Sequence, residues 1–359
     1  MPAYIIRKLL YGILVLWGVA TLVFFLFTIV PGDPVRMMLG QRADEKDVQA
    51  IREELGLNQN IGKQYLDYLN DLSFISFYKN YSSNCTDAQQ YASNISSLKI
   101  MTIGETVVVL KTPYLRYSYQ SKRPVGTILS EAFPNTLILA FVSITFAFII
   151  GVLLGVLTAV VNSNFLNRLT LFVTTIGMSL PSFFAAILIA WLLGFVLHDV
   201  TGLEMTGSLF SVDDYGNGSY LDLKNLILPA LTLGLRPLAV ITELTRTTLL
   251  DVMSMDYIRT AKAKGLKRWR VIGVHALRNA MTPVVTAVSG WFASLLAGAV
   301  FVEYVFDWKG IGVVIVDALD RFDFPVIMGA VLLIGVMLIV INIAVDIIYG
   351  VLDPRVRIK

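Results

Sequence analysis

The chain has 359 residues, of which 56% are hydrophobic and only 15% are charged, so it is too apolar for an ordinary soluble protein. Its net charge of +3 is too small to indicate binding to nucleic acid. Cys85 is the single cysteine, which excludes an intrachain disulfide framework and a cysteine-rich metal site. The composition therefore indicates an integral membrane protein that contacts lipid.

Six apolar segments are each long enough to cross about 30 Å of hydrocarbon as a helix. Backbone polar groups inside lipid must be satisfied internally, so we expect an all-α membrane protein with six transmembrane helices. Pro181 falls inside the third segment and is expected to kink it. The six segments cover residues 5–30, 133–161, 168–197, 225–250, 283–306 and 325–351.

The domain organisation follows from these segments. We expect a first transmembrane helix over 1–30, an external domain over 31–130, a five-helix core over 131–351 and a cytoplasmic tail over 352–359. The first helix is too long for the apolar region of a cleaved signal peptide, so we expect it to be retained. The core contains a cytoplasmic loop over 251–282.

Lys and Arg side chains predict the orientation, because cytoplasmic loops are enriched in them. The loop 251–282 is rich in both residue types, whereas 198–224 has only Lys224 and 307–324 has more Asp than Lys or Arg. We therefore expect both termini and 251–282 to be cytoplasmic. The segments expected outside are 31–130, 198–224 and 307–324.

The external domain has its own predicted elements. Asp44 can cap a short helix with apolar residues at helical spacing, which Gly56 would end. Thr106–Leu110 is rich in β-branched residues and predicts a strand. Residues 78–100 are rich in Ser, Asn, Gln and Tyr, which predicts an exposed excursion.

The most informative segment is 256–266, in the basic cytoplasmic loop. Ser254 or Asp256 can cap a short helix, and Gly265 can end it in a left-handed conformation. By charge alone, this helix could equally be an interfacial helix that touches anionic lipid headgroups. The segment reads Asp256, Tyr257, Ile258, Arg259, Thr260, Ala261, Lys262, Ala263, Lys264, Gly265 and Leu266.

A resemblance distinguishes these readings. Arg259-Thr260-Ala261, Gly265 and the run from His275 to Ala280 resemble the cytoplasmic EAA loop of binding-protein-dependent ABC importer permeases. The sequence resembles most closely their oligopeptide, dipeptide and nickel permease subfamily. Further similar motifs, in order along the chain, are Pro31-Gly32-Asp33-Pro34, Ser179-Leu180-Pro181-Ser182-Phe183, Leu228-Pro229-Ala230-Leu231, Gly298 to Glu303, Gly310-Ile311-Gly312 and Leu352-Asp353-Pro354-Arg355.

The resemblance implies a multi-pass cell-membrane protein, in the inner membrane of a Gram-negative bacterium, that forms half of a peptide pathway. It implies a second homologous permease, two cytoplasmic ATPase subunits or domains, and an external substrate-binding protein. It also implies that residues 256–266 form a cytoplasmic coupling helix that docks into the ATPase. The chain has no Gly-x-x-x-x-Gly-Lys-Ser/Thr phosphate loop, so it is not expected to be an enzyme or to bind a cofactor. ATP and Mg would be bound by the partners.

Two departures from the family pattern limit this transfer. Arg259 stands where the acidic residue that names the EAA loop would be, so no ion pair from a glutamate is expected there. The insert over 78–117 makes the external domain longer than the family pattern implies.

Charged residues inside a membrane span are candidates for function, because they are costly in lipid. Arg236 and Glu243 lie seven residues apart on the fourth segment, and Arg246 follows one turn later. They are expected to line the pathway, or to form an internal salt bridge or a contact with a neighbouring permease. Arg246 can also snorkel to the inner boundary.

Two further patterns are less specific indications of function. Gly151 and Gly155 have the spacing that lets helices approach closely, either within the bundle or between subunits. His275, Arg278 and Asn279 share a helical face, for which a capping role is favoured over metal binding or catalysis. No metal-ligand spacing is present.

The main alternative of another class is an ATP-independent secondary transporter. It predicts internal repeats and a coupling-ion site at broken helices, and the sequence has no convincing repeat between its halves. Within the importer class, nickel or another small solute is the alternative to peptide as cargo.

Overall fold

The computed structural model describes residues 2–29, 35, 44–54, 57–79, 98–103, 106–161, 163–212 and 218–352. The chain forms two compact units. Unit 1 comprises 1–6, 132–313 and 337–359, and unit 2 comprises 7–131 and 314–336.

Five described helices are long and apolar enough to cross a membrane, or up to six spans if one bent pair counts as a single span. The span that contains the fifth expected segment covers Arg268–Leu296, so the short helix α14 (Val300–Val305) lies outside it. The expected segment 283–306 is therefore too long at its end, and its helix begins earlier, at Leu277. The five helices are α1 (Pro2–Ile29), α6 (Val125–Val160), α10 (Ile227–Met253), α13 (Leu277–Gly298) and α16 (Phe324–Leu352).

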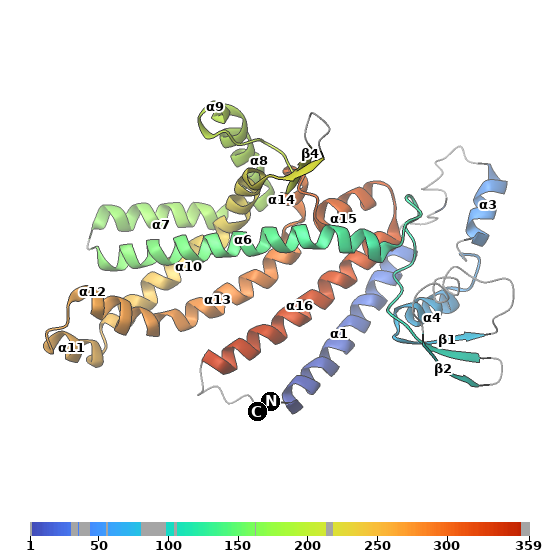
Figure 1. The fold of residues 1–359 in the computed structure, drawn as a ribbon, viewed down its shortest axis with the longest axis horizontal. Helices are drawn as coiled ribbons and strands as arrows, with labels where there is room; N and C mark the ends of the chain where they lie inside the picture. The colour runs from blue at the N-terminus through green and yellow to red at the C-terminus, as the bar shows by residue number, and fades with distance from the viewer. Residues whose placement is uncertain are drawn as a thin grey trace. The chain divides into compact units, whose positions relative to one another are not determined.

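The third expected span is broken rather than kinked. Its two parts are α7 (Asn164–Ser179) and α8 (Ser182–Ile189), which continues as the π-helix η1 (Ala190–Val196), and they are bent by 111° (Figure 1). Pro181 explains the break, because a residue before proline avoids helical geometry. Leu180 accordingly has an extended ψ of 129°.

Unit 1 packs α6, α10 and α13 around an apolar core that includes Leu139, Ile241 and Val284. Gly151 and Gly155 lie on α6 where it meets α10. A Cβ on Gly151 would lie 2.8 Å from Ile241 Cγ2, and one on Gly155 would lie 2.6 Å from Thr245 Cβ. These two glycines therefore serve close packing within this chain.

Shorter elements complete unit 1. The segment 198–224 holds α9 (His198–Thr201) and an antiparallel hairpin of β4 (Phe210–Val212) and β5 (Ser219–Leu221), before the 3-10 turn η2 (Leu223–Leu226). Between α10 and α13 lie α11 (Asp256–Ala263), α12 (Arg268–Arg270) and the π-helix η3 (Val271–Ala276). Helix α15 (Ile311–Asp320) begins in unit 1 and ends in unit 2.

Unit 2 contains most of α1 together with α3 (Glu45–Glu54), α4 (Ile61–Leu72) and a three-stranded antiparallel sheet. The strand order is β1 (Ile75–Lys79), β3 (Thr106–Leu110), β2 (Leu98–Ile103), and Ile75 pairs with Leu110. Aromatic contacts attach α4 to α1: the rings of Phe24 and Tyr68 stack with centroids 5.3 Å apart.

The local predictions for this region can be compared with unit 2. The strand Thr106–Leu110 is confirmed, and a helix follows Asp44 as expected. Gly56, which was expected to end that helix, lies outside the described residues, as do 80–97. The described ends of the segment 78–100 belong to strands β1 and β2, so the predicted excursion is shorter than its composition indicated.

Candidate functional site

Helix α11 (Asp256–Ala263) forms the first eight residues of the segment 256–266, for which the resemblance implies ATPase coupling. It follows Met255, which provides no side-chain cap, and Ser254 instead donates its hydroxyl to the carbonyl of Asp251 at 2.7 Å. The prediction that Ser254 or Asp256 caps this helix is therefore wrong. The preceding helix, α10, ends at Met253 with Ser254 as its C-cap. The Ser254 hydroxyl therefore bonds to the end of α10 and not to the start of α11.

The end of α11 has the two hydrogen bonds of a Schellman motif. The amide of Gly265 donates to the carbonyl of Lys262 at 3.0 Å, and the amide of Leu266 donates to that of Ala261 at 3.4 Å. Gly265 has a φ of +72°, and no atom lies within 4 Å of where its Cβ would be. The left-handed stop predicted at Gly265 is confirmed, and the backbone conformation favours glycine there.

One face of α11 is buried against its neighbours. Ile258 and Ala261 are buried, and Leu266 packs against the same cluster. This cluster joins the end of α10 to η3 and the start of α13, so α11 packs in a fixed position against the two long helices. The other buried members of the cluster are Leu249, Val252, Val271, Ala276 and Ala280.

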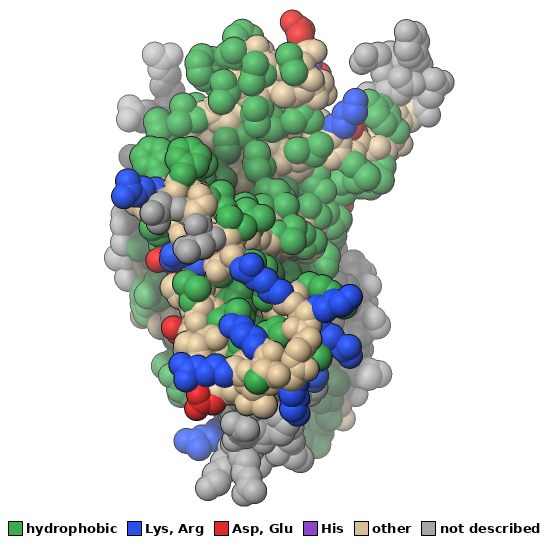
Figure 2. Space-filling model, turned by 90° about the vertical axis from the view of Figure 1, so that its left-hand side faces the viewer, with side chains coloured by type: hydrophobic (Ala, Val, Ile, Leu, Met, Phe, Trp, Pro, Cys, Tyr) green, Lys and Arg blue, Asp and Glu red, His purple; other side chains and the backbone are tan. Residues whose placement is uncertain are grey.

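The opposite face of α11 is exposed, and basic side chains are frequent on it and on the segment that follows. Figure 2 faces this end of unit 1 and shows Lys and Arg side chains gathered around it. Arg259 and Asp256 lie 3.4 Å apart but are 74% and 95% exposed, so their ion pair contributes little to stability. Trp269 adds an aromatic side chain that is 70% exposed. The exposed basic residues are Arg259, Lys262, Lys264, Lys267, Arg268 and Arg270.

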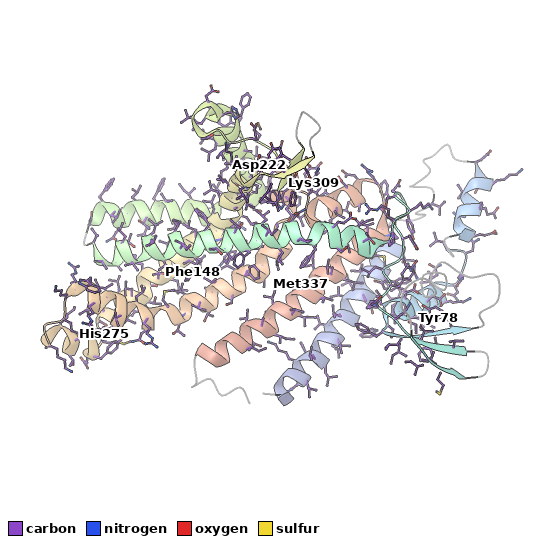
Figure 3. All side chains as sticks on the ribbon, viewed as in Figure 1. Tyr78, Phe148, Asp222, His275, Lys309 and Met337 are labelled. Carbon is purple, nitrogen blue, oxygen red and sulfur yellow. The ribbon has the colours of Figure 1, made fainter. Side chains whose placement is uncertain are left out.

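A hydrogen bond connects α11 to the start of α13. The Asn279 amide donates to the Tyr257 hydroxyl at 2.8 Å and to the carbonyl of His275 at 3.2 Å. His275 lies at this same end of the unit (Figure 3). Within the described part of the chain, no group of three or more His, Cys, Asp or Glu residues could hold a metal ion.

Polar residues occupy an exposed face on each of two membrane-spanning helices. On α10 the exposed side chains include Arg236, Glu243 and Thr247, while Arg246 is half-buried. Arg236 and Glu243 form no ion pair with each other or with any other described residue. On α13 the exposed residues include Thr282, Thr286, Gly290 and Ser294.

The exposed faces of other long helices differ in chemistry. The exposed side chains of α6 include Phe141, Ile149 and Leu153, as expected for a surface in lipid. The polar faces of α10 and α13 would leave hydroxyl and charged groups in hydrocarbon if they faced lipid, which is unfavourable. They are therefore suited to water or to another protein chain.

A pocket lies where these polar faces approach the break between α7 and α8. It has an empty volume of about 540 Å³, part of it open to solvent. Most of its lining is apolar, and Arg236 is the one charged side chain among the described residues that line it. The other lining residues are Gly177, Leu180, Ser182, Ala185, Thr232, Leu233, Leu235, Pro237, Trp291, Ser294 and Leu295.

A second cluster lies around Glu303. In the sequence, this residue stood out only as the end of the family-like motif Gly298 to Glu303. Its carboxylate is fully buried and accepts a hydrogen bond from the amide of Gly312 at 2.6 Å. The amide of Ile311 donates to the Thr136 hydroxyl at 2.8 Å. Added Cβ atoms on Gly310 or Gly312 would collide with the Glu303 carboxylate. The sequence did contain a signal for this cluster: an acidic residue in an apolar segment, followed by a Gly-x-Gly motif.

Comparison with protein families gives two matches. Residues 151–358 match the family described as binding-protein-dependent transport system inner membrane component. Residues 1–88 match the N-terminal region of such a membrane component.

Relatives of known role match along the whole chain. The dipeptide transport system permease protein DppB of Escherichia coli K12 is 35% identical over 377 residues and covers 100% of both chains. The di/tripeptide permease protein DppB of Pseudomonas aeruginosa is 34% identical and covers 99% of both. The glutathione transport system permease protein GsiC of Escherichia coli K12 is 34% identical and covers 100% of both.

Among solved structures, a chain of the inward-facing MetNI methionine ABC transporter superimposes with a TM-score of 0.52 at 18% identity. The match covers 64% of this chain and 97% of that one, and it supports the fold. The family match and the full-length relatives identify the chain as a multi-pass inner-membrane protein that belongs to the binding-protein-dependent ABC importer permeases, in their peptide subfamily.

Proposed function

We propose that this chain is one transmembrane half of an ATP-driven importer that delivers peptides to the cytoplasm. The packing of α11 carries this proposal, because a short helix with one exposed face is fixed by Ile258 and Ala261 to both α10 and α13. The same two helices bear the exposed polar faces that a pathway requires. Peptide as cargo is supported by the dipeptide and di/tripeptide permeases that match the whole chain.

The proposed mechanism uses α11, with the flanking residues up to Leu266, as a coupling helix. Its exposed face would dock into a cytoplasmic ATPase, and closure of an ATPase dimer would move it as a lever. Because its buried face packs against the ends of α10 and α13, that movement would tilt the helices that line the pathway. ATP and Mg would be bound and ATP hydrolysed by the partner subunits.

The proposed assembly has four kinds of component. Two ATPase subunits or domains would occupy the cytoplasmic side, and an external binding protein would deliver cargo. A second, homologous permease would face the polar sides of α10 and α13, because one chain leaves Arg236 and Glu243 exposed. Arg236 and Glu243 are then pathway residues.

The proposed orientation places both termini and 251–282 in the cytoplasm, with 31–130, 198–224 and 307–324 outside. The density of Lys and Arg around α11 and α12 supports it. Cysteine-accessibility labelling should find positions 264 and 90 on opposite sides of the membrane. Labelling of both from one side would contradict this orientation.

Uptake by a reconstituted complex tests the function. Vesicles that contain this chain, its partner permease and the ATPases should accumulate labelled trialanine only when ATP and the binding protein are supplied. Uptake by this chain alone without ATP would favour a secondary transporter. ATP-dependent uptake of nickel but not of peptide would support the importer function and show that the cargo is nickel.

A further inference from the structure

The pocket at the α7–α8 break combines features of a small-molecule subsite. Ligand sites are mostly apolar hollows in which a few polar groups fix the orientation of the ligand. Here leucine side chains provide apolar walls, and the guanidinium of Arg236 provides the only charge among the described lining residues. The walls come from four helices of unit 1, α7, α8, α10 and α13.

Arg236 needs a negative partner that this chain does not provide. Among the described residues no carboxylate pairs with it, although it lies within a membrane-spanning stretch. An arginine at such a depth is costly unless it meets water or an anion. The planar guanidinium can donate two parallel hydrogen bonds to one carboxylate, which makes a carboxylate the best-matched partner.

Pro237, the residue after Arg236, leaves one backbone acceptor of α10 without its usual donor. Pro237 has no N–H, so the carbonyl of Leu233 lacks the hydrogen-bond donor that residue 237 of a regular helix would supply. Leu233 and Pro237 both line the pocket. A peptide presents a carboxylate at its C-terminus and amide N–H groups next to it, and these are complementary to Arg236 and to such a carbonyl.

We propose that this pocket binds the C-terminal carboxylate of the cargo peptide, with Arg236 as its main ligand. This inference rests on the proposed function and adds the part of the peptide that the permease recognises. Every unmodified linear peptide carries that carboxylate whatever its side chains, so the subsite would accept many sequences. A carboxylate from a neighbouring permease shares the same chemistry, but the open polar faces of α10 and α13 beside the pocket favour the cargo.

The test compares two probes in the complete reconstituted complex, trialanine and its C-terminal amide. The measured quantity is the ratio of their initial uptake rates. Because one binding protein delivers both probes to every variant, its own preference cancels when ratios are compared between variants. We expect Arg236→Gln to lower the ratio of free acid to amide about tenfold relative to the unaltered complex, the scale of a lost charged hydrogen bond.

Two further variants control this result. Arg236→Lys keeps the charge but loses the forked geometry, so it should lower the ratio by a smaller factor, about threefold. It also gives the comparison if Arg236→Gln fails to assemble. Lys224→Gln removes an exposed charge that does not line the pocket, so its ratio should equal that of the unaltered complex.

The possible outcomes test the carboxylate subsite and the proposed peptide cargo separately. An unchanged ratio in Arg236→Gln overturns the subsite, and so does an equal fall in the uptake of both probes, which would assign Arg236 to a carboxylate of the neighbouring permease. If the unaltered complex transports neither probe with ATP and binding protein present, the proposed peptide cargo fails, and the subsite fails with it.

Discussion

Two glycine-containing turns of unit 1 show two different reasons for glycine. At the end of α11, Gly265 has a φ of +72° and open space around the position of its Cβ. In the first turn of α15, Gly312 has no positive φ, but its Cβ would lie 2.5 Å from Val300 Cα. Glycine is therefore favoured at the first turn by backbone conformation and at the second by lack of space.

This difference separates a docking element from a structural one. The α11 turn is exposed on one side and bears solvated charges, so its shape can be kept while its surface meets a partner. The α15 turn encloses the buried carboxylate of Glu303, and its backbone amides are satisfied from inside the unit. Changes in the second turn should therefore affect stability, whereas changes in the first should affect coupling more than stability.

The largest effect is expected from Gly312→Ala. The new Cβ would overlap the backbone of Val300 and the Glu303 carboxylate, neither of which can move freely, so the free energy of unfolding should fall by about 3 kcal/mol. Thermal unfolding of the purified chain in detergent measures this. Gly126→Ala is the matched control, because no atom lies within 4 Å of its added Cβ. Equal stability of the two variants would contradict the packing argument.

The second effect is a pH dependence that comes from Glu303. Burial raises the pKa of its carboxyl to about 7, against the opposing effect of hydrogen bonds from Thr136 and Gly312. Because this pKa lies above that of an unfolded glutamate, about 4.3, the folded chain holds the proton more tightly. The stabilisation is complete below about pH 4 and is lost as the pH rises through about 7.

We expect the free energy of unfolding to be about 2 kcal/mol lower at pH 8 than at pH 5 because of this group. Thermal unfolding of the purified chain at the two pH values measures the difference. Glu303→Gln cannot ionise, so its unfolding should depend less on pH. A pH difference as large as that of the unaltered chain would show that other groups cause it.

The sequence predicted the features that depend on neighbouring residues in the chain. The long apolar helices, the strand Thr106–Leu110 and the helix stop at Gly265 all follow from local patterns. The break at Pro181 was underestimated, because a proline signals a lost hydrogen bond but not the angle of the following segment. Local pattern also left open whether Ser254 caps α11, since a hydroxyl can bond in either direction along the chain.

Features that depend on distant contacts were not predictable from one sequence. Thr136 and Ile311 are 175 residues apart and meet only when α6 packs beside the α15 turn. The partner of Gly151 and Gly155 was likewise open until their contacts with α10 placed them within this chain. The pocket around Arg236 needs residues from four helices, so no local pattern could define it.

The third effect concerns coupling. Gly265→Val places a β-branched residue at a positive φ, so it should reduce the stability of the turn by about 1 kcal/mol or more. The chain should still insert, but ATPase co-purification should fall, or ATP should be hydrolysed without peptide uptake. Lys264→Ala removes only an exposed charge and should be mild. The reverse order, with Lys264→Ala the more harmful, would assign this segment to lipid headgroups.

The smallest effect, and the sharpest test of the lever, is expected from Tyr257→Phe. The Tyr257 hydroxyl accepts the hydrogen bond from Asn279 that joins α11 to α13, and both side chains are exposed. Its loss should reduce the free energy of unfolding by only about 0.5 kcal/mol. If α11 moves α13 through this contact, peptide uptake per ATP hydrolysed should fall about twofold while ATPase co-purification stays normal. Asp256→Asn, which weakens only an exposed ion pair within α11, is the control and should keep the full ratio. An unchanged ratio in Tyr257→Phe would leave the apolar contacts of Ile258 and Ala261 as the route by which α11 moves the long helices.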